Sequence, residues 1–129
     1  MVYIREKEKA FDQSGKTSTP KLPAGPVQTK YATHIVEPVV TGGLETPWAL
    51  AFLPDGRKLV TEKPGRLRIL DENWKLEPQP VAGTPAVVVS NQGGLLDVAP
   101  APDFAKSGWI YLSYSAPAPG DAKSSMTKI

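Results

Sequence analysis

An internal repeat constrains the fold more than any other feature of this sequence. The stretch LAFLPDGRKLVTE is echoed by VAPAPDFAKSGWIYLSY, and each copy contains an apolar strand, a Pro-Asp turn and a second β-type run. Pro54-Asp55 and Pro102-Asp103 lie 48 residues apart. This period, with about four strands in each repeat, is typical of one blade of a β-propeller. A β-sandwich with a similar density of turns is the structural alternative.

Further β-type runs surround the repeat. In RLRIL, residues 66–70, charged and apolar side chains alternate as they do in a half-buried strand. We also predict strands in HIVEPVV, residues 34–40, where Pro38 favours a sheet edge, and in the β-branched run AVVVS, residues 86–90. Because no segment shows a sustained helical period, the chain is predicted to be all-β.

The organisation predicted from composition is a flexible leader over residues 1–30 and a partial β-propeller over residues 31–129. The leader carries six Lys/Arg and three Asp/Glu among Ser, Thr and Pro, with no period of either kind. The remainder carries nine Lys/Arg and ten Asp/Glu, a balance that argues against a nucleic-acid partner. The chain lacks cysteine, which excludes disulfides and thiolate metal sites. It shows neither a signal-peptide core nor the roughly 20-residue apolar run of a membrane span.

The predicted number of blades is too small for a closed propeller. The chain holds about two blades, whereas closed propellers need about four or more. Open strand edges are expected to leave the chain partly disordered or self-associating by itself. The final residues, SSMTKI, are predicted to begin another strand. We therefore interpret the sequence as an amino-terminal piece of a longer propeller.

The motifs PWALAFLPDG, LVTEKPGRLRI, QGGLLD, PDF and YLSY, in that order, resemble the first two blades of the glucose/sorbosone dehydrogenase family. The resemblance covers about residues 34–129. It implies a six-bladed, soluble aldose sugar dehydrogenase that depends on pyrroloquinoline quinone (PQQ). The implied reaction is oxidation of an aldose at C1 to the lactone, with hydride delivered to PQQ, a histidine as general base and calcium supporting the cofactor. The resemblance further implies a periplasmic or secreted enzyme.

Most groups of that site are expected outside these residues. His34 does not match the family's catalytic histidine motif and is interpreted as an ordinary strand residue. The base is expected downstream of residue 129, and we expect this chain alone to be inactive and to bind neither PQQ nor calcium. Ala101 stands where the family usually has a histidine before Pro-Asp-Phe. This departure is compatible with the alternative function, a non-catalytic binding or interaction module derived from a β-propeller.

Gln92 is the candidate substrate-binding residue. In NQGGLLD it matches the family glutamine that faces sugar and quinone at the mouth of the central channel. The innermost strands of a propeller line this channel, so a residue just before GLLDVA is predicted to lie at one rim. A primary amide there can both donate and accept hydrogen bonds. Gly93 and Gly94 are predicted to let the backbone approach a flat ligand. The alternative is a turn amide that contacts only water.

The remaining predictions are structural. The turn TEKPGR, residues 61–66, is predicted to share the rim of Gln92, with Glu62, Lys63 and Arg66 solvated by default. Asp97 is predicted to be a buried hydrogen-bond acceptor in the inner strand, because an unpaired buried charge is costly. The tryptophans are assigned packing roles: between blades or sheet faces for Trp48 and Trp109, and over a turn for Trp74.

Overall fold

The computed structural model describes residues 23–38, 40 and 42–129, and it divides the chain into two compact units with the boundary between Glu37 and Pro38. In the first unit, β1 (Val27–Gln28) pairs antiparallel with β2 (Thr33–His34). Strand β1 therefore falls inside the stretch predicted as a flexible leader.

The strand predicted over residues 34–40 is wrong beyond His34, since the described residues after His34 belong to no strand and Val39 lies outside the description. A physical reason is visible in the register. Continuing the β1–β2 pairing would place Pro26 opposite Ile35, and a proline has no N–H to donate to the ladder.

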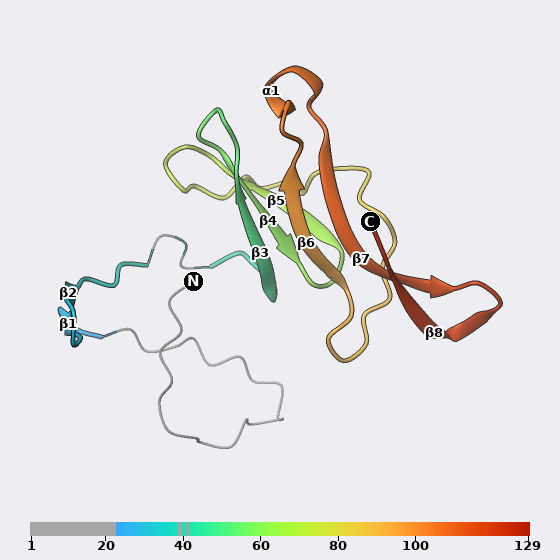
Figure 1. Cartoon of the computed structure of the whole chain (residues 1–129), viewed down its shortest axis with the longest axis horizontal. Coiled ribbons are helices and arrows are strands. Elements are labelled where there is room, and N and C mark those ends of the chain that lie inside the picture. Colours follow the sequence, from blue (N-terminus) through green and yellow to red (C-terminus); the bar gives the residue numbers. More distant parts are fainter. Residues whose placement is uncertain (1–22, 39, 41) are drawn as a thin grey trace. The chain divides into compact units, whose positions relative to one another are not determined.

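The second unit contains two three-stranded antiparallel sheets (Figure 1). The first has the order β3-β4-β5 and the second the order β6-β7-β8. Their bounds are β3 (Pro47–Phe52), β4 (Lys58–Glu62), β5 (Arg66–Leu70), β6 (Leu95–Pro100), β7 (Ile110–Ala118) and β8 (Asp121–Lys128), with α1 (Phe104–Ser107) between β6 and β7. Strands β3 and β6 begin 48 residues apart, so the repeat seen in the sequence is a structural repeat.

Both Pro-Asp pairs lie in the connection between the first two strands of their sheet. After β3 the connection is a tight turn, in which the Gly56 N–H donates to Leu53 O at 3.1 Å and Gly56 has a φ of 86°. After β6 the connection contains α1, which ends at Gly108 in the left-handed conformation. The same sequence signal therefore marks equivalent places with different local structures.

The first sheet has three strands, so the predicted fourth strand is absent from that repeat in the described residues. The second sheet reaches its third strand, β8, at Lys128, and for this repeat the prediction of about four strands is not tested. Residues 76–81 run beside β5, and the N–H groups of Glu77 and Val81 donate to β5 carbonyls at 2.9 and 2.8 Å. Pro78 and Pro80 interrupt this segment, and their missing N–H groups prevent a continuous ladder.

The run AVVVS is likewise not a strand, although the Val88 N–H donates to Ser115 O at 2.8 Å. The strand predicted in SSMTKI is confirmed, because residues 124–128 belong to β8, but this strand begins earlier than predicted, at Asp121. In the described part of the chain, no helix is long and apolar enough to cross a membrane.

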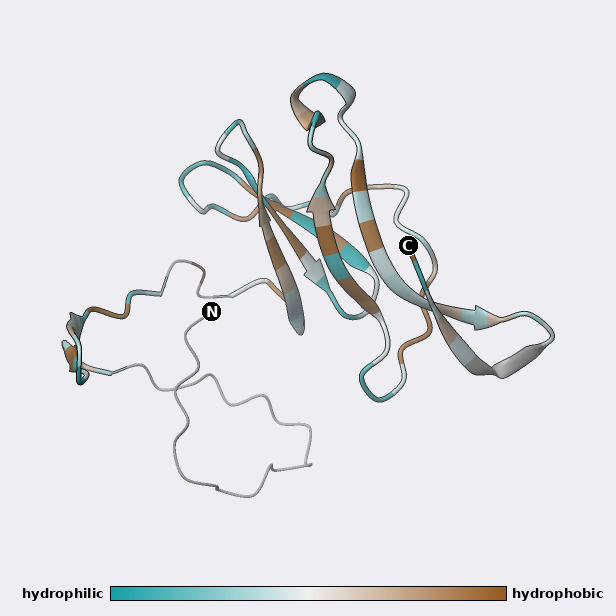
Figure 2. Ribbon diagram, viewed as in Figure 1, coloured by the Kyte–Doolittle hydropathy of each residue, from teal (hydrophilic) through white to brown (hydrophobic). Residues whose placement is uncertain are grey.

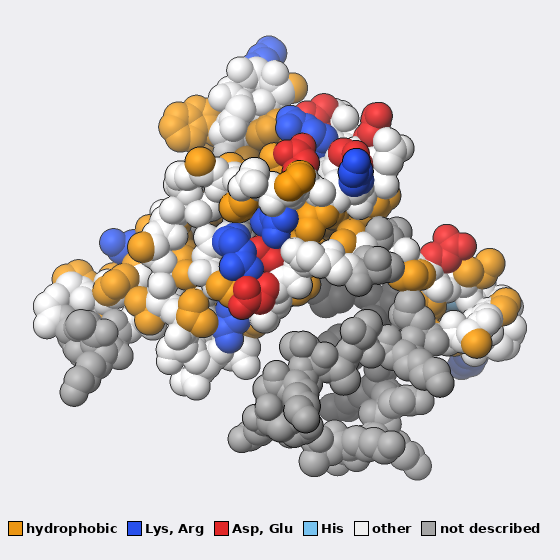
Figure 3. All heavy atoms as spheres, turned by 180° about the vertical axis from the view of Figure 1, so that it is seen from behind, with side chains coloured by type: hydrophobic (Ala, Val, Ile, Leu, Met, Phe, Trp, Pro, Cys, Tyr) orange, Lys and Arg blue, Asp and Glu red, His pale blue; other side chains and the backbone are white. Residues whose placement is uncertain are grey.

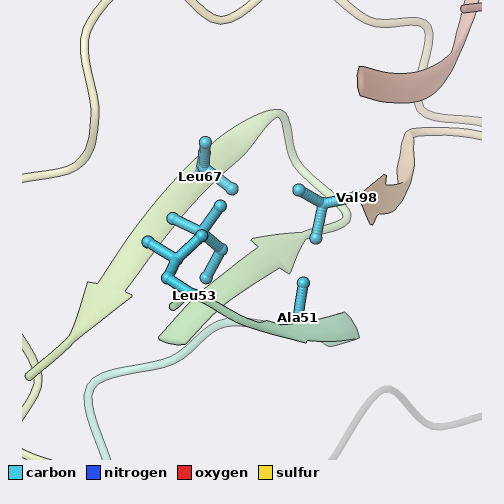
Figure 4. Close-up of a cluster of buried hydrophobic side chains, with 5 residues drawn as sticks. Ala51, Leu53, Leu67 and Val98 are labelled. Atoms are coloured by element: carbon cyan, nitrogen blue, oxygen red, sulfur yellow. The ribbon is translucent and has the colours of Figure 1, made fainter. Parts of the chain in front are cut away.

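The core lies where the two sheets pack together. Figure 2 shows hydrophobic residues along β3 and β6, and Figure 4 shows Leu53 and Leu67 grouped beside Ala51 and Val98. These residues and Leu59 form one buried cluster. The inner face of β3 carries small or medium apolar side chains, so β6 can approach closely. The two sheets therefore hold β3 and β6 side by side, an arrangement that positions the loop before β6.

Large apolar side chains lie on the opposite face of β3. Trp48 is 42% exposed and Phe52 61% exposed, while Trp109, before β7, is 70% exposed. Neither ring is therefore packed between the two sheets of this unit, and packing of Trp48 and Trp109 between blades stays a prediction. Trp74 lies against Phe52, edge to face at 6.0 Å between ring centroids, in the turn after β5.

Self-association through open strand edges stays a prediction, and the exposed apolar face of β3 adds to its physical basis. Sedimentation velocity of the 129-residue chain is expected to show a sedimentation coefficient that rises with protein concentration. A compact monomer over the whole concentration range would contradict this expectation.

Candidate functional site

Gln92 lies in the loop before β6, at the end of that strand opposite α1 (Figure 1). Its side chain is exposed. The loop is a tight turn, since the Gly93 N–H donates to Ser90 O at 2.6 Å and Asn91 has a φ of 48°. The turn therefore presents the Gln92 amide to solvent at the position predicted from the sequence, while its contact with a sugar remains a prediction.

The turn that joins β4 and β5 lies against this loop. The Leu95 N–H donates to Lys63 O at 3.0 Å, and Lys63 Nζ donates to Asn91 O. Two residues before Lys63, Thr61 Oγ1 donates to Leu96 O at 2.6 Å. The prediction that residues 61–66 share a rim with Gln92 is thus confirmed.

The two glycines after Gln92 make room for protein atoms. A Cβ on Gly94 would lie closer than 3.0 Å to Lys63 O, and a Cβ on Gly93 would lie 2.9 Å from Ser115 Oγ. Sequence reasoning assigned this space to a flat ligand. The structure corrects that assignment, because the absent side chains permit contact between the loop, the β4–β5 turn and β7.

Glu62, predicted to be solvated, is fully buried. Its carboxylate accepts hydrogen bonds from Arg66 Nε at 2.7 Å and from the Glu45 N–H, and Arg68 Nη1 lies 3.5 Å away. Arg66 also donates to Glu45 Oε2 at 2.7 Å. Figure 3, seen from behind the view of Figure 1, shows positive and negative side chains lying beside one another.

Two opposing influences act on the pKa of Glu62. Burial by itself would raise this pKa, because a buried charge loses its hydration. The hydrogen bonds from Arg66 and the Glu45 N–H, together with the charges of Arg66 and Arg68, outweigh burial and hold the pKa below its usual value. Glu62 is therefore an ionised buried anchor of the β4–β5 turn.

Arg68 extends this network to neighbouring loops. Its Nη1 donates to Gly43 O at 3.1 Å and its Nη2 to Glu77 O at 2.9 Å. The residues that sequence reasoning missed are thus Glu62 as an anchor and Arg68 as its partner. A usable signal was present, since Glu62 pairs with Arg66 and Val60 with Arg68 across one hairpin, which places both cations near one carboxylate.

Asp97 differs from its prediction in the opposite direction to Glu62, because it was predicted to be buried and is exposed. The register of β6 and β7 shifts between Leu95 and Val98, and Asp97 lies exposed within this irregular stretch. An extra residue in one strand interrupts the alternation of side chains between the two faces. The predicted burial is wrong, whereas the predicted acceptor role is confirmed by the Val98 N–H, which donates to Asp97 Oδ1 at 2.9 Å.

The rim offers a small set of groups for a polar ligand. Gln92 supplies an amide, while the Lys63 ammonium donates to Asn91 O and Arg66 is bound by two carboxylates. The Gln92 amide suits hydrogen bonds to hydroxyl or carbonyl groups along one edge of a polar ligand. Among the residues described, no group of three or more His, Cys, Asp or Glu side chains could hold a metal ion.

Comparison with known proteins identifies relatives of the second unit. A family model described as Glucose / Sorbosone dehydrogenase matches residues 44–129. The aldose sugar dehydrogenase YliI of Escherichia coli (strain K12) is 51% identical over 85 residues, which cover 65% of this chain and 22% of that protein.

Solved structures of dehydrogenases also match this chain. A glucose dehydrogenase crystal structure matches with a TM-score of 0.60 at 51% identity, covering 66% of this chain and 24% of the other. The PQQ-bound aldose sugar dehydrogenase from Streptomyces coelicolor matches with a TM-score of 0.57 at 31% identity, covering 64% and 25%. This chain spans about a quarter or less of the length of each relative.

Proposed function

Because this chain belongs to the glucose/sorbosone dehydrogenase family, we propose that it forms part of a PQQ-dependent enzyme that oxidises aldose sugars at C1 to the lactone. The observation that carries the proposal is the exposed Gln92 amide, presented at a rim by the turn that precedes β6. In this oxidation the sugar loses a hydride from C1 and a proton from its C1 hydroxyl. When bound, PQQ supplies the two-electron acceptor.

The residues of this chain would bind and orient the sugar. The Gln92 amide NH₂ can donate to a sugar oxygen while its carbonyl accepts from a sugar hydroxyl, so one side chain can fix the orientation of the ring. The general base is proposed to lie beyond residue 129, since His34 lies exposed on β2. Calcium support of the cofactor and a periplasmic or secreted location stay predictions.

The alternative, a non-catalytic binding or interaction module, was compatible with Ala101. Ala101 is buried after β6, and its N–H donates to Trp109 O at 3.0 Å. It therefore lies at the end of β6 opposite Gln92. A histidine missing at that end changes packing near α1 and leaves the groups of the rim unchanged, so we retain the enzyme as the proposed function.

Replacing Gln92 by Ala tests the proposal. We suggest a chimera in which residues 44–129 replace the matching segment of the Escherichia coli aldose sugar dehydrogenase. In this chimera, Gln92→Ala is expected to lower kcat/KM for an aldose about tenfold, the effect of losing hydrogen bonds worth about 1.4 kcal/mol. Steady-state dye reduction in the presence of PQQ measures it.

Gln79→Ala is the matched control, because Gln79 is also an exposed glutamine but lies beside β5. It is expected to leave kcat/KM unchanged. Unchanged kinetics in Gln92→Ala, or an equal loss in both variants, would refute the role proposed for Gln92.

A further inference from the structure

Lys63 contacts the loop before β6, residues 90–94 (the Gln92 loop), through both its main chain and its side chain. Its carbonyl accepts from the Leu95 N–H at 3.0 Å, where β6 begins. Its ammonium donates to the carbonyl of Asn91, the neighbour of Gln92. One residue thus holds both ends of the loop that carries the candidate substrate contact.

The turn that carries Lys63 is itself firmly held. The Lys63 N–H donates to Thr46 O at 3.0 Å, and the Gly65 N–H donates to Glu62 O at 2.9 Å. The buried Glu62 carboxylate and its arginine partners fix the base of this turn. A rigid turn of this kind can impose its geometry on a neighbouring loop, because moving it would expose a buried charge.

The Lys63 ammonium also lies 6.0 Å from the centroid of the Trp48 ring. An aromatic face attracts a cation, and its bulk limits the positions open to a flexible lysine chain. The ring therefore favours the conformation in which Nζ reaches Asn91 O.

The hydrogen bond from Lys63 to Asn91 O stabilises the tip of the loop. Asn91 has a φ of 48°, which is a conformation with positive φ that few residue types adopt readily. Gly94, at the other end, is held by the Ser115 N–H, which donates to Gly94 O at 2.8 Å. The bond from Lys63 to Asn91 O acts at the Asn91 end of the loop, directly beside Gln92.

We infer that Lys63 is a positioning residue that fixes the Gln92 loop against the β4–β5 turn. Its main chain sets where β6 begins, and its ammonium holds Asn91 so that the Gln92 amide keeps one orientation. The kinetic consequence of this role rests on the proposed function, whereas the ordering of the loop does not.

Hydrogen–deuterium exchange of the 129-residue chain tests the ordering directly. In Lys63→Met, which keeps most of the length of the side chain but removes the donor, backbone amides of residues 90–95 are expected to exchange about 3- to 10-fold faster. Lys63→Arg, which keeps a charged donor, is expected to restore most of the protection. Lys106→Met is the control, since Lys106 is an exposed lysine of α1, at the far end of β6. Unchanged exchange in Lys63→Met overturns the inference.

Kinetics of the same variants in the chimera separate positioning from direct contact. Lys63→Met is expected to raise KM for the aldose about 3- to 10-fold with a smaller change in kcat, as expected when the orientation of a binding group is lost. A raised KM without faster exchange would make Lys63 a direct ligand contact and overturn the positioning role. If Gln92→Ala has no kinetic effect while Lys63→Met still loosens the loop, the proposed function fails and the positioning role stands.

Discussion

Replacing Glu62 by Gln is expected to lower the free energy of unfolding by about 3 kcal/mol at pH 7, because breaking a buried ion pair leaves its partners uncompensated. Glu62 is fully buried and its Oε2 lies 2.7 Å from Arg66 Nε. Arg68, whose side chain is 10% exposed, loses its only partner carboxylate among the described residues and cannot regain full hydration. The neutral amide keeps the volume of Glu62, so the change reports charge rather than packing.

Urea unfolding followed by circular dichroism measures the effect. The control is Asp55→Asn, because Asp55 forms an ion pair of equal length with Arg57, 2.7 Å, but at an exposed turn. Exposed pairs contribute little to stability, so this variant is expected to unfold close to the parent. If Glu62→Gln and Asp55→Asn shifted the urea midpoint equally, burial would not be the source of the Glu62 effect.

Acid should remove the same stabilisation in the unchanged chain. The pKa of Glu62 is lowered in the folded state from an ordinary value of 4.5, so the folded state binds its proton less readily than the unfolded state. The contribution is fully present above about pH 5 and is lost as the pH falls through the lowered pKa of the folded protein. The groups that face the carboxylate are Arg66, Arg68 and the Glu45 N–H.

The pH dependence has a matching experiment. Midpoints of urea unfolding measured from pH 7 down to pH 2 are expected to fall more steeply below pH 4.5 in the unchanged chain than in Glu62→Gln. Parallel curves would mean that other carboxylates cause the acid sensitivity of this unit.

The sequence predicted the repeat and the position of Gln92 because both depend on local signals. The Pro-Asp turns recur at a fixed period, and a polar residue before an apolar strand must lie at the end of a sheet. The place of the 61–66 turn on the same rim followed from the same reasoning, since a strand connection lies at one end or the other of its sheet.

The two carboxylates show what the alternation pattern of a single strand does not contain. Asp97 sits in an apolar run and was predicted to be buried, but a register shift in β6 leaves it exposed. Glu62 ends a polar-looking strand, yet it becomes buried because Glu45 and two arginines gather around it. Burial of either residue depends on pairing between strands, and a single alternation pattern does not specify that pairing.

Gly94→Ala is expected to have the largest effect on the rim itself. A Cβ at this position would lie closer than 3.0 Å to Lys63 O and 2.7 Å from Lys63 Cγ, and Gly94 has a φ of 155°. Overpacking and backbone strain together predict a loss of about 3 kcal/mol in the free energy of unfolding. Because the clash is with backbone, the loop must move away from the β4–β5 turn. In the chimera, kcat/KM should therefore fall further than in Gln92→Ala, as the whole loop is displaced rather than one amide removed.

Gly56→Ala separates the clash from the strain. Gly56 has a φ of 86°, and a Cβ there would lie 3.6 Å from Glu72 Cβ, an ordinary contact. This variant carries only the cost of an unfavourable backbone conformation, about 1–2 kcal/mol, and lies at the far end of β3 from the rim. Urea unfolding and chimera kinetics of both variants distinguish the effect of the steric clash from that of backbone strain. If Gly94→Ala kept the kcat/KM of the parent, the contact between Lys63 and the Gln92 loop would have no bearing on the sugar, and Gln92 would act without this support.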